Sequence, residues 1–186
     1  MTDPELVAQD GIGVPDHLAR LWTPHRMAYV TGGSGSAGPP AEQNGDEQTC
    51  PFCRIPTLPD GEGLIVGRGR TVYAVLNLFP YNPGHLMVVP YRHIPDYTDL
   101  SPDELAEFSE FTRRAMTVIR SVSAPHGFNL GINAGSAAGA GIAAHLHQHV
   151  VPRWGGDSNF MPVVGLTKVL PQLLADTRRL LSRAWG

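Results

Sequence analysis

The sequence has few cysteines, few charged residues and no long apolar run, and each shortage excludes a class of protein. Two cysteines are too few for a disulfide scaffold. Charged residues make up 17% of the chain, the formal net charge is -3 and no basic run occurs, so we expect no extended nucleic-acid partner. No apolar run approaches the roughly 20 residues that span a bilayer, and residues 1–10 lack a signal-peptide pattern. We therefore expect a cytoplasmic protein with no membrane partner.

The chain is long enough for one domain, and its composition predicts where that domain begins. With 186 residues, of which 42% are hydrophobic, it can bury one substantial core. Residues 32–48 are rich in glycine, serine and proline and show no hydrophobic periodicity, which predicts a flexible linker. Residues 1–31 are predicted to form an N-terminal extension with a short helix that starts near Asp16 and is broken at Pro24. The folded domain is predicted to cover residues 49–186.

Helix-like and strand-like patterns predict the fold class of this domain. Ser101-Pro102-Asp103-Glu104 combines an N-cap serine with proline and glutamate at the first and third helical positions, which predicts a helix to about Ser123 with Leu105 on its apolar face. Leucine spacing predicts a second helix over residues 166–185. The predicted strands cover residues 64–66, 71–76, 86–89, 128–133 and 145–151. This order predicts an α+β domain, in which an antiparallel sheet of about five strands has helices packed on one face.

The most informative segment is residues 145–152, with the sequence HLHQHVVP. Its three histidines stand at alternate positions, so they would project from one face of an extended segment, and Pro152 is predicted to end the strand. Three imidazoles could bind a metal, hold phosphate oxygens, or supply one nucleophile with two helpers. On the opposite face, Gln148 lies among residues predicted to face the helices, so its side chain needs a polar partner.

This segment and its upstream landmarks resemble the histidine triad (HIT) superfamily. The landmarks are Asn77, the sequence Pro83-Gly84-His85 and Asn133, in that order along the chain. The residues after the triad, Pro152 to Asp157, further resemble the actinobacterial diadenosine tetraphosphate phosphorylases of this superfamily. Residues 167–169, 176–179 and 21–24 extend that narrower similarity over most of the chain.

The resemblance implies a nucleotidyl transferase that works through a covalent intermediate. The middle histidine of the triad, His147, would attack the α-phosphorus of a nucleotide. His149 would hold a phosphate oxygen or pass a proton, and His85 and His145 would complete the catalytic set. Inorganic phosphate as the acceptor would give phosphorolysis of diadenosine tetraphosphate to ATP and ADP. The alternative is hydrolysis of dinucleoside polyphosphates or of nucleoside phosphoramidates.

The same resemblance implies a set of nucleotide-binding residues and partners. Asn77 would bind the ribose and Asn133 would lie beside the phosphates, although Asn77 could simply form a turn. Backbone N–H groups around Gly139 would cradle phosphate charge. Many members carry Gln, Ser or Thr just before the triad, whereas residues 139–144 contain none, so Ser136 could substitute for them. A divalent cation could accompany the nucleotide, and a homodimer or larger homo-oligomer is expected.

The sequence Cys50-Pro51-Phe52-Cys53 has three interpretations: a zinc half-site, a redox pair or two ordinary thiols. The resemblance implies that His93 and His145 complete a tetrahedral Cys2His2 site for a structural zinc ion. Such a site has no open coordination position, so it would anchor the start of the domain to the histidine segment. No βαβ pattern surrounds the cysteines, so no redox cofactor is expected.

Two further interpretations follow from chemistry alone. The triad could bind a catalytic zinc ion that activates water. In a strand, however, the Cα atoms of His145 and His149 would lie about 13 Å apart, so one ligand would have to come from elsewhere. A non-catalytic nucleotide-binding module could keep the same pocket, although binding alone needs no nucleophile at His147.

Overall fold

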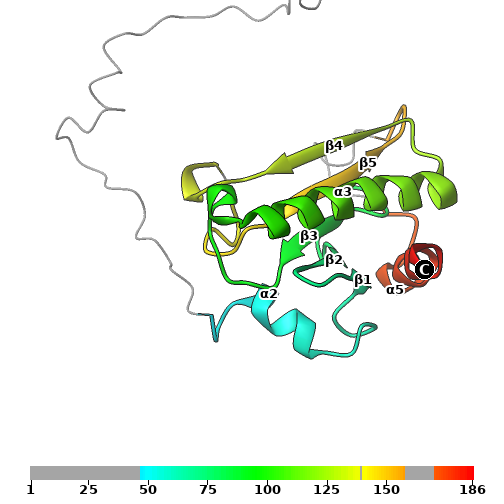
Figure 1. The fold of residues 1–186 in the computed structure, drawn as a ribbon. Helices are drawn as coiled ribbons and strands as arrows, with labels where there is room; N and C mark the ends of the chain where they lie inside the picture. Colours follow the sequence, from blue (N-terminus) through cyan, green and yellow to red (C-terminus); the bar gives the residue numbers. More distant parts are fainter. Residues whose placement is uncertain (1–46, 139, 158–169) are drawn as a thin grey trace, which may run out of the picture. The chain divides into compact units, whose positions relative to one another are not determined.

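The computed structural model describes residues 47–138, 140–157 and 170–186 (Figure 1). The predicted N-terminal helix and almost all of the predicted linker lie outside these residues. The elements are α2 (Pro51–Arg54), η2 (Ile55–Thr57), β1 (Ile65–Arg68), β2 (Val72–Leu76), β3 (Leu86–Pro90), η3 (Tyr97–Asp99), α3 (Pro102–Ser123), β4 (Gly127–Ile132), η4 (Ser136–Ala138), β5 (Gln148–Arg153) and α5 (Leu174–Trp185). Among the described residues, no helix is long and apolar enough to cross a membrane.

The strands form one antiparallel sheet of five strands, which confirms the predicted fold class. Their order is β1-β2-β3-β5-β4, so the last strand in sequence lies inside the sheet, between β3 and β4. In this register His149 lies opposite Met87 of β3 on one side and Gly131 of β4 on the other. Strand β5 is therefore held by hydrogen bonds from both neighbours at the position of His149.

The two faces of the sheet bury different sets of side chains, because successive residues of a strand point to opposite faces. On one face, α3 packs over β2 and β3, which bury Val72, Ala74, Leu86 and Val88 there, and α5 packs against α3 and β1 (Figure 1). This arrangement confirms that the long helices cover one face. The other face carries Tyr73, Val75, Met87 and Val89, and the short α2 segment covers part of it with Cys50 and Phe52. We call it the histidine face, because His149 lies on it beside Met87.

Helix α3 begins and ends where the sequence predicted. The Ser101 hydroxyl accepts a hydrogen bond from the Glu104 N–H at 3.3 Å, and the Glu104 carboxylate accepts one from the Ser101 N–H at 2.8 Å. The helix stops at Ala124, whose φ of 43° is left-handed. The prediction that Leu105 lies on the apolar face that covers the sheet was wrong, since this residue is 37% exposed. The first turn instead buries Glu104, which also pairs with Arg92 at 2.7 Å.

The predicted bounds of the histidine strand were also wrong. Strand β5 runs from Gln148 to Arg153 instead of from 145 to 151, so only His149 of the triad lies in it. The N–H of Leu146 donates to the carbonyl of Ile94 at 2.6 Å, outside the ladder. Pro152 does not end the strand. The pairing of β5 with β3 ends at Val150, so beyond this residue β5 pairs with β4 alone. Proline has no N–H to donate, but on the side without a neighbouring strand no hydrogen bond of the sheet is lost.

The C-terminal helix is shorter than predicted. It begins at Leu174, whereas residues 170–173 are not helical and residues 166–169 lie outside the described part. Pro171 disfavours the helical conformation of the residue before it, so a helix that includes Leu170 is disfavoured. Leu181 and Trp185 of α5 are buried and join the core with α3.

Gln148 has the polar partner that its position required. Its side chain lies on the α3 side of β5, where the Thr112 hydroxyl donates to its Oε1 at 3.4 Å. Its neighbours on that side, Leu146 and Val150, belong to the same core as α3. This confirms the predicted orientation of the alternate residues, although Leu146 precedes the strand.

Candidate active site

The structure brings His85, His147 and His149 together on the histidine face. The ring centroids of His147 and His149 are 5.1 Å apart, and those of His85 and His149 are also 5.1 Å apart. His85 and His147 are buried, while His149 is partly exposed. His149 comes from β5, His85 directly precedes β3, and His147 directly precedes β5. The ring of Phe52 from α2 packs 4.9 Å from that of His147.

A backbone hydrogen bond fixes the orientation of His147. Its Nδ1 lies 2.8 Å from the carbonyl oxygen of His145, which can only accept, so Nδ1 carries the proton and Nε2 keeps a free electron pair. Burial lowers the pKa of His147, which favours the neutral imidazole. A neutral ring with an unprotonated Nε2 has the form that a nucleophilic histidine needs.

A second chain of hydrogen bonds assigns the protons of the other two histidines. The N–H of Tyr81 donates to His85 Nδ1 at 3.0 Å, so the His85 proton is on Nε2. That Nε2–H donates to His149 Nδ1 at 2.9 Å. His149 therefore carries its own proton on Nε2. Burial, followed by the charge of His149, lowers the pKa of His85 to about 3, so this chain is neutral near pH 7 and presents an N–H at His149.

A cavity of about 430 Å³ opens next to His149 on the histidine face of β4 and β5. Its volume lies within the range typical of pockets for small molecules. Asn133, a predicted nucleotide-binding residue, lines it. The prediction missed the other polar residues of the wall, among them Asn82, Asn129 and Arg153. The residues that line the cavity are Tyr81, Asn82, Asn129, Leu130, Gly131, Asn133, His149, Val151 and Arg153.

Among the remaining predicted nucleotide-binding residues, Asn77 does not line the cavity. The Asn77 Oδ1 accepts from the N–H of Phe79 at 3.0 Å, which is the turn considered as the alternative, and its amide nitrogen is 3.5 Å from His85 Nδ1. A ribose contact of Asn77 stays a prediction. Ser136 begins η4, and its side chain lies outside what the structure describes. Gly139 also lies outside the described residues.

The four predicted metal ligands converge on one point. The ligand atoms of Cys50, Cys53, His93 and His145 all lie within 4.8 Å of one another. Cys50 Sγ is 3.3 Å from His145 Nδ1, and Cys53 Sγ is 3.3 Å from His93 Nδ1. Zinc bonded to sulfur and nitrogen at about 2.0–2.3 Å in a tetrahedron places its ligand atoms roughly 3.3–3.8 Å apart. The donor set and its spacing therefore fit a zinc ion.

The surroundings of this cluster further fit a structural metal. The Nε2–H of His145 donates to the carbonyl of Pro90 at 2.9 Å, which leaves the electron pair of Nδ1 directed at the other ligands. Burial, with the neighbouring Cys50, raises the pKa of the Cys53 thiol to about 12, so without a metal this thiol is not a reactive thiolate. His145 faces the cysteines and His149 faces His85, so the triad does not converge on one catalytic ion.

Comparisons with known proteins agree with this geometry. The family model described as the HIT domain matches residues 61–156. An AP-4-A phosphorylase of Mycobacterium tuberculosis is 53% identical over 185 residues, which cover 100% of this chain and 93% of that protein. A bis(5'-nucleosyl)-tetraphosphatase [asymmetrical] of Schizosaccharomyces pombe is 38% identical over 86 residues, 46% of this chain and 47% of that protein. A Zn-bound histidine triad family protein from Mycobacterium smegmatis superposes with a TM-score of 0.59 at 27% identity, covering 75% of this chain and 95% of that one.

Proposed function

This chain belongs to the HIT domain family, and we propose that it cleaves diadenosine tetraphosphate by phosphorolysis, with ATP and ADP as products. The observation that carries the proposal is the geometry of His147, a buried neutral imidazole whose Nδ1 is fixed and whose Nε2 is free. The similarity to the mycobacterial phosphorylase over the full chain supports the substrate and the acceptor.

The reaction has two displacements at phosphorus. In the first, Nε2 of His147 forms a bond to the α-phosphorus, the bond to the bridging oxygen breaks, and ATP leaves. In the second, an oxygen of inorganic phosphate attacks the same phosphorus, the P–N bond breaks, and ADP leaves. The Nε2–H of His149, oriented by His85, donates to a non-bridging oxygen whose charge grows in each transition state.

Hydrolysis is the second candidate function, because water can attack the same intermediate. The similarity to the fission yeast tetraphosphatase over residues of the HIT domain favours it as the alternative. Water in place of phosphate would give ATP and AMP from diadenosine tetraphosphate. The histidines have the same roles in both reactions, so only the acceptor differs.

The proposal includes a structural zinc ion held by Cys50, Cys53, His93 and His145. The ion would cross-link α2 to the segments around β3 and β5, and it would take no part in the chemistry. His145 links the two functions, since its ring is a ligand and its carbonyl holds His147. Zinc would thus stabilise the backbone on which the nucleophile is oriented.

We also propose that the protein is a cytoplasmic homodimer. Within the described residues, β4 has β5 as its only hydrogen-bonded neighbour, so one edge of the sheet is open. Asn129, Leu130 and Gly131 are exposed along it, which is unusual for a long edge strand unless a second chain covers it. Pairing of two β4 strands would extend the sheet across the dimer.

Product analysis with and without inorganic phosphate tests the proposed function. Purified protein incubated with diadenosine tetraphosphate should release ATP and ADP only when phosphate is present. ATP and AMP without phosphate would instead establish hydrolysis. No turnover in either condition would contradict both functions.

A further inference from the structure

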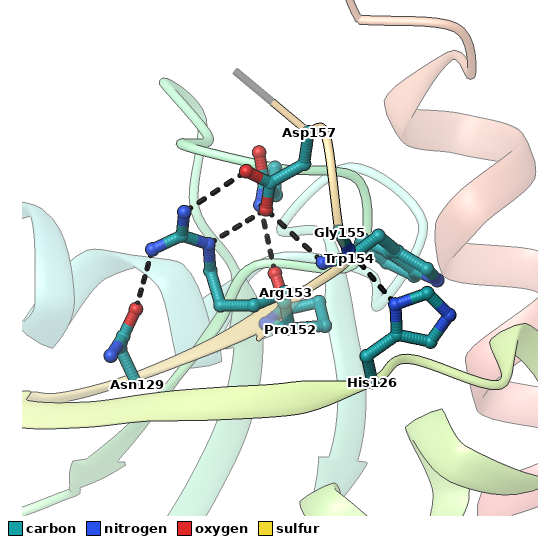
Figure 2. Close-up of polar contacts among 8 residues, drawn as sticks. His126, Asn129, Pro152, Arg153, Trp154, Gly155 and Asp157 are labelled. Atoms are coloured by element: carbon teal, nitrogen blue, oxygen red, sulfur yellow. Dashed lines mark hydrogen bonds and ion pairs between the residues drawn. The ribbon is translucent and has the colours of Figure 1, made fainter.

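A polar network at the end of β5 lies beside the cavity, and its centre is the carboxylate of Asp157 (Figure 2). Arg153 donates to it twice, from Nε at 2.7 Å and from Nη2 at 2.9 Å. The N–H of Trp154 and the amide of Asn82 donate to the same carboxylate, at 3.1 and 2.7 Å. The side chain of Asp157 is only 10% exposed. These bonds point into the protein and leave the carboxylate little access to a ligand.

Asn82 connects this network to the active site. Its side chain is buried, and its amide nitrogen donates both to Asp157 and, at 2.9 Å, to the carbonyl of Pro152. Its own backbone carbonyl accepts a hydrogen bond from the N–H of His85 at 3.0 Å. Asn82 is therefore clamped to the end of β5 on one side and holds the backbone of His85 on the other.

The loop that contains Asn82 has little apolar packing to hold it in place. The side chains of Leu78, Phe79 and Tyr81 are 60%, 80% and 58% exposed. Yet this loop sets the tautomer of His85, because the N–H of Tyr81 donates to His85 Nδ1 and the Tyr81 ring stacks on that of His85 at 4.9 Å. With few buried apolar contacts, the position of such a loop depends on its hydrogen bonds.

We propose that Asp157 is a positioning residue that, through Asn82, holds His85 where it donates to His149. The inference rests on the proposed function, in which the Nε2–H of His149 meets the phosphate. Without Asp157, the Asn82 amide keeps its bond to the Pro152 carbonyl of β5 but loses its shorter, charge-assisted bond to the carboxylate, and the hydrogen bond from His85 Nε2 to His149 Nδ1 becomes intermittent. His149 then loses its fixed tautomer, and the N–H that it presents is misplaced.

Arg153 supports this role of Asp157 and does not act as an anion-binding residue in this arrangement. Its Nε and Nη2 bind Asp157, and its Nη1 donates to Asn129 Oδ1 at 2.7 Å. All three guanidinium nitrogens have partners, and an adjacent carboxylate compensates the charge. The guanidinium also holds the pKa of Asp157 well below its usual range, so the carboxylate stays charged at neutral pH.

The test compares Asp157→Ala, which removes the acceptor of the Asn82 bond, with the wild-type protein and with Asp60→Ala, which removes the partner of another arginine, Arg68, in a pair outside the site. Asp157→Ala should lower kcat for phosphorolysis about tenfold with KM nearly unchanged, because the reacting groups are misplaced and not removed. Nitrogen-15 spectra of the imidazoles should show His149 changing from the Nε2–H form to a mixture of tautomers. Asp60→Ala should match the wild type in both measurements.

A double mutant tests whether Asp157 acts through Asn82. If it does, Asn82→Ala combined with Asp157→Ala should be no worse in kcat than the poorer single variant. Asp157→Glu, which keeps the carboxylate, should restore part of kcat relative to Asp157→Ala, and it serves if Asp157→Ala does not fold. An unchanged His149 tautomer in these variants, or losses that multiply in the double mutant, would overturn the proposal. The spectra report the tautomer of His149 without any turnover of substrate. A wild-type protein that is inactive on diadenosine tetraphosphate would therefore contradict the proposed function but leave the role of Asp157 testable.

Discussion

The two outer histidines of the triad share one spacing pattern but have opposite surroundings. His145 is buried, and both of its ring nitrogens are committed, one to the cysteine cluster and one to Pro90. His149 lines an open cavity, and its Nδ1 accepts a hydrogen bond from His85, which lies behind a loop of exposed residues. The spacing therefore places the three histidines close together, whereas the partners supplied by distant segments decide which ring is structural and which meets the substrate.

His147 lies between these two regions, and its replacement should have the largest effect. His147→Asn removes the nucleophile, so turnover of diadenosine tetraphosphate should fall by about 10⁴-fold or more. Nucleotide binding should persist, because the cavity is lined by other residues. Steady-state kinetics and calorimetric titration measure the two quantities. Turnover at the wild-type rate would refute the assignment of the nucleophile.

In the region around His149, beside the cavity, the replacement His149→Ala should lower the rate of catalysis and leave stability unchanged. Loss of a hydrogen-bond donor to the developing charge should lower kcat about 10²-fold to 10³-fold. Zinc content and the midpoint of thermal unfolding should stay close to the wild type, since His149 makes no contact with the metal cluster in the structure. Loss of zinc in this variant would contradict the claim that His149 acts in catalysis and has no part in the metal site.

In the buried region around His145 and the two cysteines, the replacement Cys50→Ser should mainly lower the stability of the protein. Removing one ligand should release the metal and lower the free energy of unfolding by more than about 3 kcal/mol. Urea unfolding with and without a chelator, together with elemental analysis, measures this effect. The matched comparison is His149→Ala, which should keep its zinc. Wild-type protein purified without chelators and free of zinc would contradict the metal site.

The effect that is smallest at neutral pH concerns the pH dependence of stability. Burial lowers the pKa of His85 from 6.5 to about 3, so between these values the unfolded chain binds a proton that the folded protein does not. Stability from this group is therefore complete above pH 6.5 and falls as the pH decreases toward 3. His85→Gln should reduce the slope of unfolding free energy against pH by about one proton in this window. An unchanged slope would mean that His85 is protonated in the folded protein.

Local patterns predicted much of the fold and the central part of the site. The cap at Ser101 fixed the start of α3, and the β-branched runs located β1, β2 and β3, because these signals act over a few residues. The resemblance supplied the two cysteines and two histidines of the candidate metal site. Pro152 was misjudged, since a local rule about proline does not reveal that β5 has only one neighbour there.

The residues that sequence reasoning missed act through long-range contacts. Asn82 binds Pro152 and Asp157, which are 70 and 75 residues away in the chain. An asparagine before Pro83-Gly84-His85 gives no local sign of such partners. The shift of the start of β5 to Gln148 has a similar cause, because Leu146 is held by Ile94 from another segment instead of by a strand.

The covalent state of His147 tests the central claim most directly. Protein mixed with diadenosine tetraphosphate in the absence of phosphate, quenched in alkali and analysed by intact-mass and peptide mass spectrometry, should carry one adenylyl group on His147. Addition of phosphate before the quench should remove this group and release ADP. Formation of ATP and ADP with no adduct on His147, or with the adduct on another residue, would contradict the account.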